Sequence, residues 1–144
     1  MTAARPAVVD TNVVVAGLLT ADAEAPTARI LEGMLDGSIP FLLSVELLAE
    51  YRTVLLRPAI KSRHRLSESQ VDRLLEQLTL EALVREPARG ADAPDPRDQH
   101  VWDLVAAHPG AILVTGDARL LAAATPSRSL LSPASFVALR GSSR

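Results

Sequence analysis

The 144-residue sequence contains no cysteine, which excludes disulfide bonds and thiolate zinc sites and is typical of a protein in a reducing compartment. It also lacks a long hydrophobic run near its start, where the longest, residues 13–19, has seven residues and follows an acid. Such a run is too short to cross a bilayer and is poorly flanked for a signal peptide. These absences predict a cytoplasmic protein that does not bind a membrane.

Histidine and tryptophan are scarce. The three histidines, His64, His100 and His108, are not spaced as metal ligands, so we interpret them as ordinary surface or interface residues. Trp102 is the only tryptophan, and packing explains it better than stacking on a nucleobase. Neither residue type predicts a functional site.

Apolar residues, in contrast, make up 48% of the chain, which predicts a folded globule with a real core in one domain. We expect this domain to cover residues 1–140 and residues 141–144 to form a disordered tail. No internal repeat or low-complexity tract divides it.

The formal net charge of −2 conceals an asymmetry, because residues 51–65 carry +5 with no acid and the remainder carries −7. A basic segment beside an acidic remainder suits a protein that holds a polyanion near carboxylates. A solvated basic face explains the same pattern equally well. The candidate contacts to a polyanion are Arg52, Arg57, Lys61, Arg63 and Arg65.

Residues 7–15 surround one acid with valine, which favours an extended strand. We place the first, central strand at residues 8–10, with Asp10 and Asn12 at its carboxyl end, where parallel sheets bind ligands. A carboxylate buried there needs a cation or hydrogen-bond donors. A structural acid bonded to nearby backbone is the alternative.

Strand and helix patterns alternate along the rest of the chain, which predicts a three-layer α/β/α sandwich around a mostly parallel sheet of four to five strands. Residues 17–26, 57–65 and 86–96 are expected to be connections. Further strands are expected at residues 41–43, 83–84, 111–114 and 129–131. Helices are expected at residues 26–36, 45–56, 68–80, 118–124 and 133–139, and after residue 95.

The expected helix at residues 45–56 carries two acids that a helical wheel separates. Glu50 lies about 100° from the middle of the apolar stripe and Glu46 about 140°. Glu50 is therefore at the edge of the buried face, from which it can reach a cleft. Its alternative role is a surface ion pair with Arg52 or Arg57.

Four acids occupy equivalent positions, since Asp10 and Asp117 follow strands while Glu50 and Asp98 lie in helices that follow strand ends. In a parallel sheet these ends share one edge, and four clustered carboxylates repel unless a cation neutralises them. Oxygen ligands without cysteine favour Mg²⁺ or Mn²⁺, which catalyse phosphoester hydrolysis, and the basic segment suggests a nucleic acid. Helix-start chemistry explains Asp95 fully and Asp98 partly, and Asp117 also suits a plain N-cap.

The combination of motifs resembles the PIN-domain family, and within it the toxins of bacterial toxin–antitoxin pairs related to VapC-type ribonucleases. The motifs cover nearly the whole chain in the family's order. They are residues 9–13 (VDTNV), 44–50 (SVELLAE) with 54–55 (VL), 95–98 (DPRD), 114–121 (VTGDARLL) and 131–136 (LSPASF).

The resemblance implies a metal-dependent endoribonuclease in which Asp10, Glu50, Asp98 and Asp117 hold one or two Mg²⁺ or Mn²⁺ ions. It implies that Asn12 and Thr115 orient an acid or water, and it favours Glu50 over Glu46. It also implies a homodimer and a small antitoxin partner that covers the cleft. Asp95 stays outside this set, because its N-cap role is sufficient.

Two other functions remain open from the residues alone. The first is a phosphatase or phosphotransferase with Asp10 as nucleophile, although such enzymes typically place an acid at position 12, here Asn12, and use a lysine, here only Lys61. The second is a non-catalytic module that binds RNA or protein, in which the acids are structural.

Overall fold

The computed structural model describes residues 5–123 and 129–142. Three parallel strands, β1 (Ala7–Val9), β4 (Ile112–Val114) and β5 (Ser129–Leu131), form a sheet in the order β1-β4-β5. A parallel pair, β2 (Leu42–Leu43) and β3 (Leu83–Val84), joins it through one bridge between Ala7 and Phe41. The prediction of a parallel α/β fold is therefore confirmed. The strands form one three-stranded and one two-stranded sheet instead of a single sheet.

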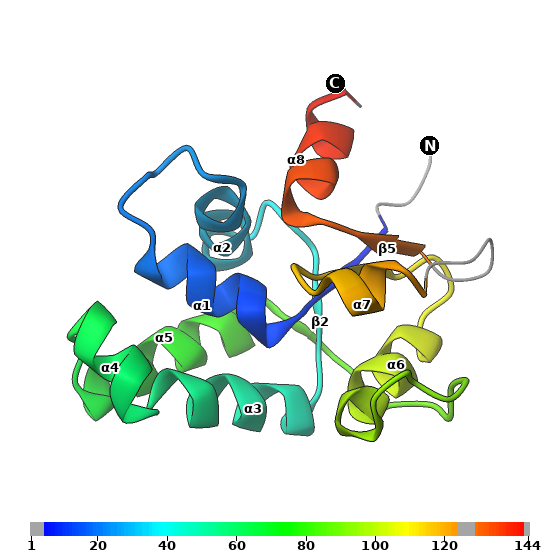
Figure 1. The fold of residues 1–144 in the computed structure, drawn as a ribbon, viewed down its shortest axis with the longest axis horizontal. Helices are drawn as coiled ribbons and strands as arrows, with labels where there is room; N and C mark the ends of the chain where they lie inside the picture. Colours follow the sequence, from blue (N-terminus) through cyan, green and yellow to red (C-terminus); the bar gives the residue numbers. More distant parts are fainter. Residues whose placement is uncertain (1–4, 124–128, 143–144) are drawn as a thin grey trace.

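Helices lie on both sides of this sheet (Figure 1). Among the described residues none is long and apolar enough to span a membrane. In chain order the helices are α1 (Thr11–Leu19), α2 (Pro26–Asp36), α3 (Val45–Leu55), α4 (Pro58–His64), α5 (Glu68–Glu81), the 3-10 turn η1 (Pro96–Asp98), α6 (Gln99–Ala106), α7 (Ala118–Leu121) and α8 (Pro133–Ser142).

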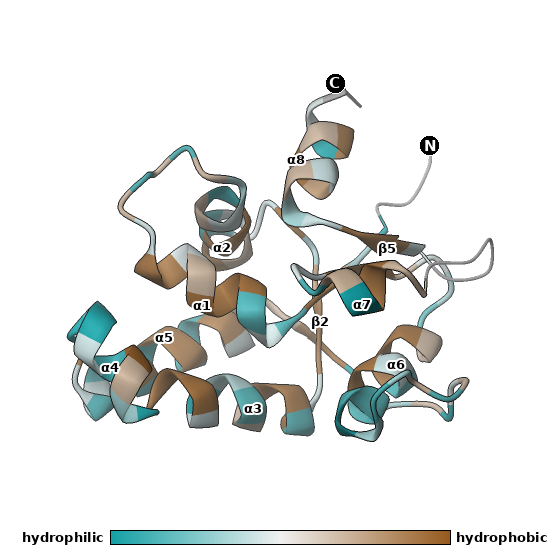
Figure 2. Cartoon of the chain, in the orientation of Figure 1, coloured by the Kyte–Doolittle hydropathy of each residue, from teal (hydrophilic) through white to brown (hydrophobic). Residues whose placement is uncertain are grey.

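The core forms where the strands meet α1, α2, α3 and α5. Every residue of β1 and β4 is buried, because parallel strands covered on both faces have no side for water. The strands are accordingly hydrophobic in Figure 2, whereas hydrophilic residues gather on α4. Tyr51 of α3 is fully buried and its hydroxyl donates a hydrogen bond to the carbonyl of Val9, which ties α3 to β1.

Local signals predict several helix boundaries correctly. Ser44 caps α3 by accepting from the backbone N–H of Leu47, and Ser67 forms a capping box with Gln70. Gly37 ends α2 with a φ of 81°, a left-handed conformation that glycine adopts without strain.

The valine-rich residues around Asp10 correct the sequence prediction. The strand ends at Val9, Asp10 is the N-cap of α1, and the valines at 13–15 are helical. All three valines are buried, because α1 packs against α2 and α3. Burial in this layer outweighs the preference of valine for strands. The one local signal for this helix is Asp10 itself, because aspartate is a common N-cap residue.

Two other segments differ from expectation. The basic residues after Pro58 form α4 instead of a connection, since proline suits the first turn of a helix. Helix α7 ends at Leu121, and residue 124 of its predicted range lies outside the described residues. Gly141 and Ser142, expected in a tail, belong to α8, while residues 143–144 lie outside the described part.

Candidate active site

The site begins where β1 and β4 end side by side. Val9 pairs with Val114, and the backbone N–H of Asp10 donates to the carbonyl of Val114 over 2.9 Å. This register places Asp10 beside Thr115, and Asp117 two residues further on. Residues 105 positions apart in sequence thus share one sheet edge.

Asp10 is a buried carboxylate, only 6% exposed, that neutral donors hold in place. Its Oδ1 accepts from the Thr11 N–H at 2.9 Å, while Oδ2 accepts from the Thr115 hydroxyl at 2.7 Å. Burial raises the pKa of Asp10, and the negative charges of Glu50 and Asp117 raise it further. Within the described residues no salt bridge to Asp10 is present, so its charge lacks a cationic partner.

Asn12 and Thr115 tie the two strand ends together. The Asn12 side chain donates to Asp10 Oδ2 over 3.0 Å and accepts from the backbone N–H of Gly116, also at 3.0 Å. The Thr115 hydroxyl accepts from the Asp117 N–H over 3.1 Å. Both side chains therefore fix the orientation of Asp10.

Glu50 reaches the same place from α3. The Thr11 hydroxyl donates to its Oε2, and Nε2 of His100 lies 3.2 Å from its Oε1. The hydrogen bond with His100 lowers the pKa of Glu50 and raises that of His100. Glu46 is exposed, as the helical wheel predicts. In the described part of the chain no ion pair joins Glu50 to Arg52 or Arg57; Glu50 has hydrogen bonds with Thr11 and His100, and the charge of Arg57 also lowers its pKa.

Asp98 and Asp117 complete the acidic group. Burial raises the pKa of Asp98, with the charges of Asp10, Asp95 and Glu50 adding to the rise. Asp117 caps α7, and its bond from the Arg119 N–H lowers its pKa. Asp95 caps η1 and is held by the guanidinium of Arg97 at 2.8 Å, which lowers its pKa to about 2.

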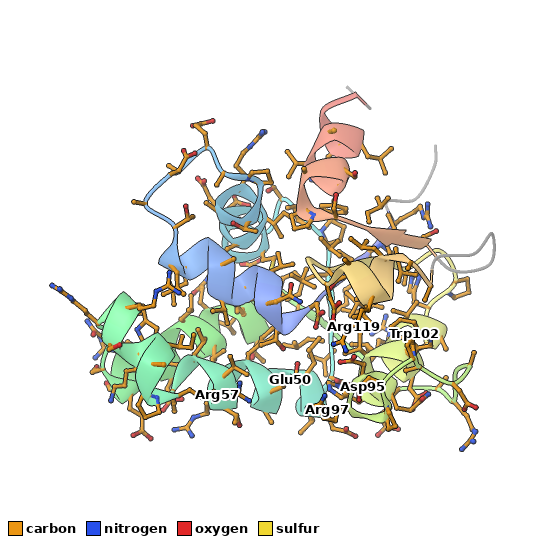
Figure 3. All side chains as sticks on the ribbon, in the orientation of Figure 1. Glu50, Arg57, Asp95, Arg97, Trp102 and Arg119 are labelled. Atoms are coloured by element: carbon orange, nitrogen blue, oxygen red, sulfur yellow. The ribbon has the colours of Figure 1, made fainter. Side chains whose placement is uncertain are left out.

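One cleft with a volume of about 720 Å³ collects these groups. It is lined by the four acids Asp10, Glu50, Asp98 and Asp117. Two members of the basic segment, Arg57 and Arg63, line it as well. The four acids come from the residues that follow β1 and β4, from α3 and from η1, and Figure 3 shows Glu50 on α3.

The other predicted basic contacts lie elsewhere. Arg52 is bound to Glu68 at 2.6 Å and to Asp72 at 2.8 Å, both on α5. These exposed ion pairs direct Arg52 away from the acidic group. Lys61 and Arg65 are not among the residues that line the cleft.

Residues 6–119 match the family model described as a PIN domain, which covers well over half of the chain. This chain belongs to the PIN-domain family. No curated protein matches it significantly. PIN domains are usually nucleases and typically bind divalent metal ions.

The acids of this PIN domain suit a divalent metal ion by their chemistry. They supply hard oxygen ligands, the kind that Mg²⁺ and Mn²⁺ prefer, and like charges already raise the pKa of Asp10 and Asp98. Among the described residues, however, no three acidic or histidine side chains stand in a ready ligand array.

Sequence reasoning misses two residues of this PIN-domain site. The predicted strand ends at Asp10 and Thr11 is given no role, because its contact with Glu50 arises only where α1 crosses α3. His100 lacks the spacing of a metal ligand, yet its side chain is only 14% exposed and faces Glu50 from α6. The sole signal for His100 is its position two residues after Asp98.

The raised pKa of Asp10 predicts how the thermal stability of an Asp10→Asn variant depends on pH when a chelator keeps metal ions away. The folded state binds this proton more tightly than the unfolded state, so Asp10 loses its stabilising effect as the pH rises above about 4. Asparagine carries no charge, so the melting temperature of the variant relative to wild type should be higher at pH 7 than at pH 4.

Asp36→Asn is the matched control for this measurement. Hydrogen bonds within the Ser38 turn lower the pKa of the exposed Asp36, so its contribution is present at pH 7 and lost as the pH falls through its lowered pKa, below about 4. The melting temperature of Asp36→Asn relative to wild type should therefore rise as the pH is taken from 7 to below about 4, whereas that of Asp10→Asn falls. A difference for Asp10→Asn that is independent of pH contradicts the prediction.

Proposed function

We propose that this PIN domain is a metal-dependent endoribonuclease that hydrolyses RNA phosphodiester bonds in the cytoplasm, as the toxin of a toxin–antitoxin pair. One observation carries the enzymatic part: four carboxylates from separate elements line one cleft together with Arg57 and Arg63. Among the described residues Asp10 and Asp98 have no ion pair, and a purely structural role would leave no reason to place them beside arginines in an open cleft.

In this proposal Asp10, Glu50, Asp98 and Asp117 hold one or two Mg²⁺ or Mn²⁺ ions. A divalent ion bound there acidifies water and stabilises charge on a phosphoryl oxygen. Asn12 and Thr115 keep Asp10 oriented. Thr11 and His100 hold the two oxygens of Glu50, so the carboxylate is aimed before the substrate arrives.

Arg57 and Arg63 bind the RNA in this scheme. Guanidinium groups pair with phosphate oxygens through charge-assisted hydrogen bonds, and they offset the repulsion between the acids and the RNA backbone. Lys61 and Arg65, on the same helix and at its end, attract the strand from further away.

The toxin role, the antitoxin and the homodimer rest on the family resemblance of the motifs. The antitoxin would cover the acidic cleft, and the homodimer would be visible as twice the chain mass in solution. The phosphatase alternative gains no support, because Lys61, the lysine that it would need, does not line the cleft.

Purified protein is expected to cut single-stranded RNA internally in millimolar Mg²⁺ or Mn²⁺ and to stop in excess EDTA. Induced expression in bacteria is expected to arrest growth, whereas an Asp117→Asn variant should not, because asparagine still caps α7 but carries no charge. Cleavage that survives EDTA would rule out the metal-dependent mechanism. RNA cleavage without growth arrest would retain the nuclease and reject the toxin role.

A further inference from the structure

The acidic group has a second open side. Asp98 and Asp117 line the cleft, and they also line a smaller pocket of about 100 Å³. Pro94, Asp95 and Arg119 belong to the walls of this smaller pocket. The same two carboxylates border both cavities, so the smaller pocket lies beside the cleft at the acidic group.

Two arginines stand at this second side. Arg97 and Arg119 are highly exposed, at 86% and 77% of their side chains. The guanidinium of Arg97 contacts Asp95 at 2.8 Å, and that of Arg119 lies 3.5 Å from Asp117. In Figure 3 both lie on one side of Glu50, while Arg57 lies on the other.

Both guanidinium groups act on the acidic group itself. The charge of Asp98 raises the pKa of Arg97, and the charge of Arg119 lowers the pKa of Asp117. Ion pairs this exposed contribute little to stability, since water screens them. Each arginine can therefore exchange its carboxylate partner for a phosphate. The planar guanidinium group donates two parallel hydrogen bonds to a phosphate as well as to a carboxylate.

We propose that Arg97 and Arg119 form a second phosphate-binding rim, opposite Arg57 and Arg63, so that RNA crosses the acidic group and is held on both sides of the cut bond. This inference rests on the proposed nuclease function. The two rims explain how a polyanion approaches four carboxylates, because cations meet the strand before and after them.

The first test measures binding of a labelled single-stranded RNA in Mg²⁺, in an Asp10→Asn background that prevents cleavage. Arg97→Ala with Arg119→Ala should weaken binding by at least about 10-fold and reduce the slope of log K against log salt by roughly 0.7 for each phosphate that is no longer neutralised. Arg57→Ala with Arg63→Ala should do the same. The alanine variants keep both helix caps, because the backbone N–H groups of residues 97 and 119 still donate to the side chains of Asp95 and Asp117.

Arg73→Ala is the matched control, because it removes one positive charge from an exposed position on α5 that lines neither cavity. It should leave both the affinity and the salt slope unchanged. If the variants of the second rim behave like Arg73→Ala while those of the first rim do not, the second rim does not exist.

A second test locates each rim along the strand. RNAs with one phosphate replaced by a neutral methylphosphonate, on either side of the cut bond, are cleaved by otherwise wild-type protein and by each rim variant. Neutral phosphates on one side should lose their effect only in the Arg97/Arg119 variant, and those on the other side only in the Arg57/Arg63 variant.

Failure of this inference and failure of the proposed function give different results. If the wild type cleaves RNA but a neutral methylphosphonate slows cleavage only on one side of the cut bond, the second rim is overturned and the nuclease function stands. No binding and no cleavage by the wild type overturn both.

Discussion

Replacing Asp10 by asparagine is expected to lower the rate of RNA cleavage by at least about 10³-fold, because a bound divalent ion contributes several kcal/mol and each 1.36 kcal/mol is a factor of ten. Asparagine has nearly the same shape: its one oxygen still accepts from the Thr11 N–H, while its amide nitrogen replaces Oδ2 and donates to the Thr115 hydroxyl instead of accepting from it. It lacks the charge that an ion requires. The fold should therefore survive while the chemistry is lost.

The measurement is the initial rate of cleavage of a labelled RNA at saturating Mn²⁺. Asp95→Asn is the matched control, because Asp95 caps η1 and asparagine caps equally well; its rate should stay within about 3-fold of wild type. Mn²⁺ should also raise the melting temperature of the wild type more than that of Asp10→Asn. Full activity of Asp10→Asn would remove Asp10 from the catalytic set.

Replacing Gly17 by alanine should destabilise the protein by about 1–3 kcal/mol, the usual range for overpacking. A Cβ at position 17 would lie 2.5 Å from the backbone carbonyl oxygen of Thr27, so α1 and α2 must move apart. The displacement shifts Thr11 and Asn12 at the other end of α1. Cleavage should therefore fall as well, although Gly17 does not line the cleft.

Gly141→Ala is the control of opposite sign. It lies in the last turn of α8, and a Cβ added there would have no atom within 4 Å. Alanine there should leave stability unchanged or raise it by up to about 1 kcal/mol, because alanine is the better helix former. Denaturant melts of the two variants measure the contrast; equal stability of Gly17→Ala and wild type would show that α1 and α2 do not constrain each other.

Local patterns are enough to predict most of the fold. Some signals depend only on residues a few positions away, so a short window of sequence is enough to predict them. They are the helix caps Ser44 and Ser67, the helix stop at Gly37 and the fully apolar strand β4. The prediction for α1 is wrong for the opposite reason. Its valines are helical because other elements bury them, and no window of the sequence contains those elements.

The candidate site divides in the same way. Parallel topology alone brings Asp10 and Asp117 together, since strand ends of one direction share an edge. The partners of Glu50 depend on tertiary packing: His100 lies 50 residues away and Thr11 lies 39 residues away. Arg52 is predicted to bind a polyanion together with the rest of the basic segment. From α3, however, its side chain pairs with Glu68 and Asp72 of α5.

The separation of Asp10 from Thr115 and Asp117 along the chain also decides when the proposed site is complete. Strand β1 emerges from the ribosome early, yet its carboxyl end acquires Thr115 only after β4 has been translated and has paired with it. A nascent chain that stops before β4 lacks Asp117 and the hydroxyl that orients Asp10. The ribonuclease proposed above would, by this order of assembly, stay inert beside the messenger and ribosomal RNA that surround its own synthesis.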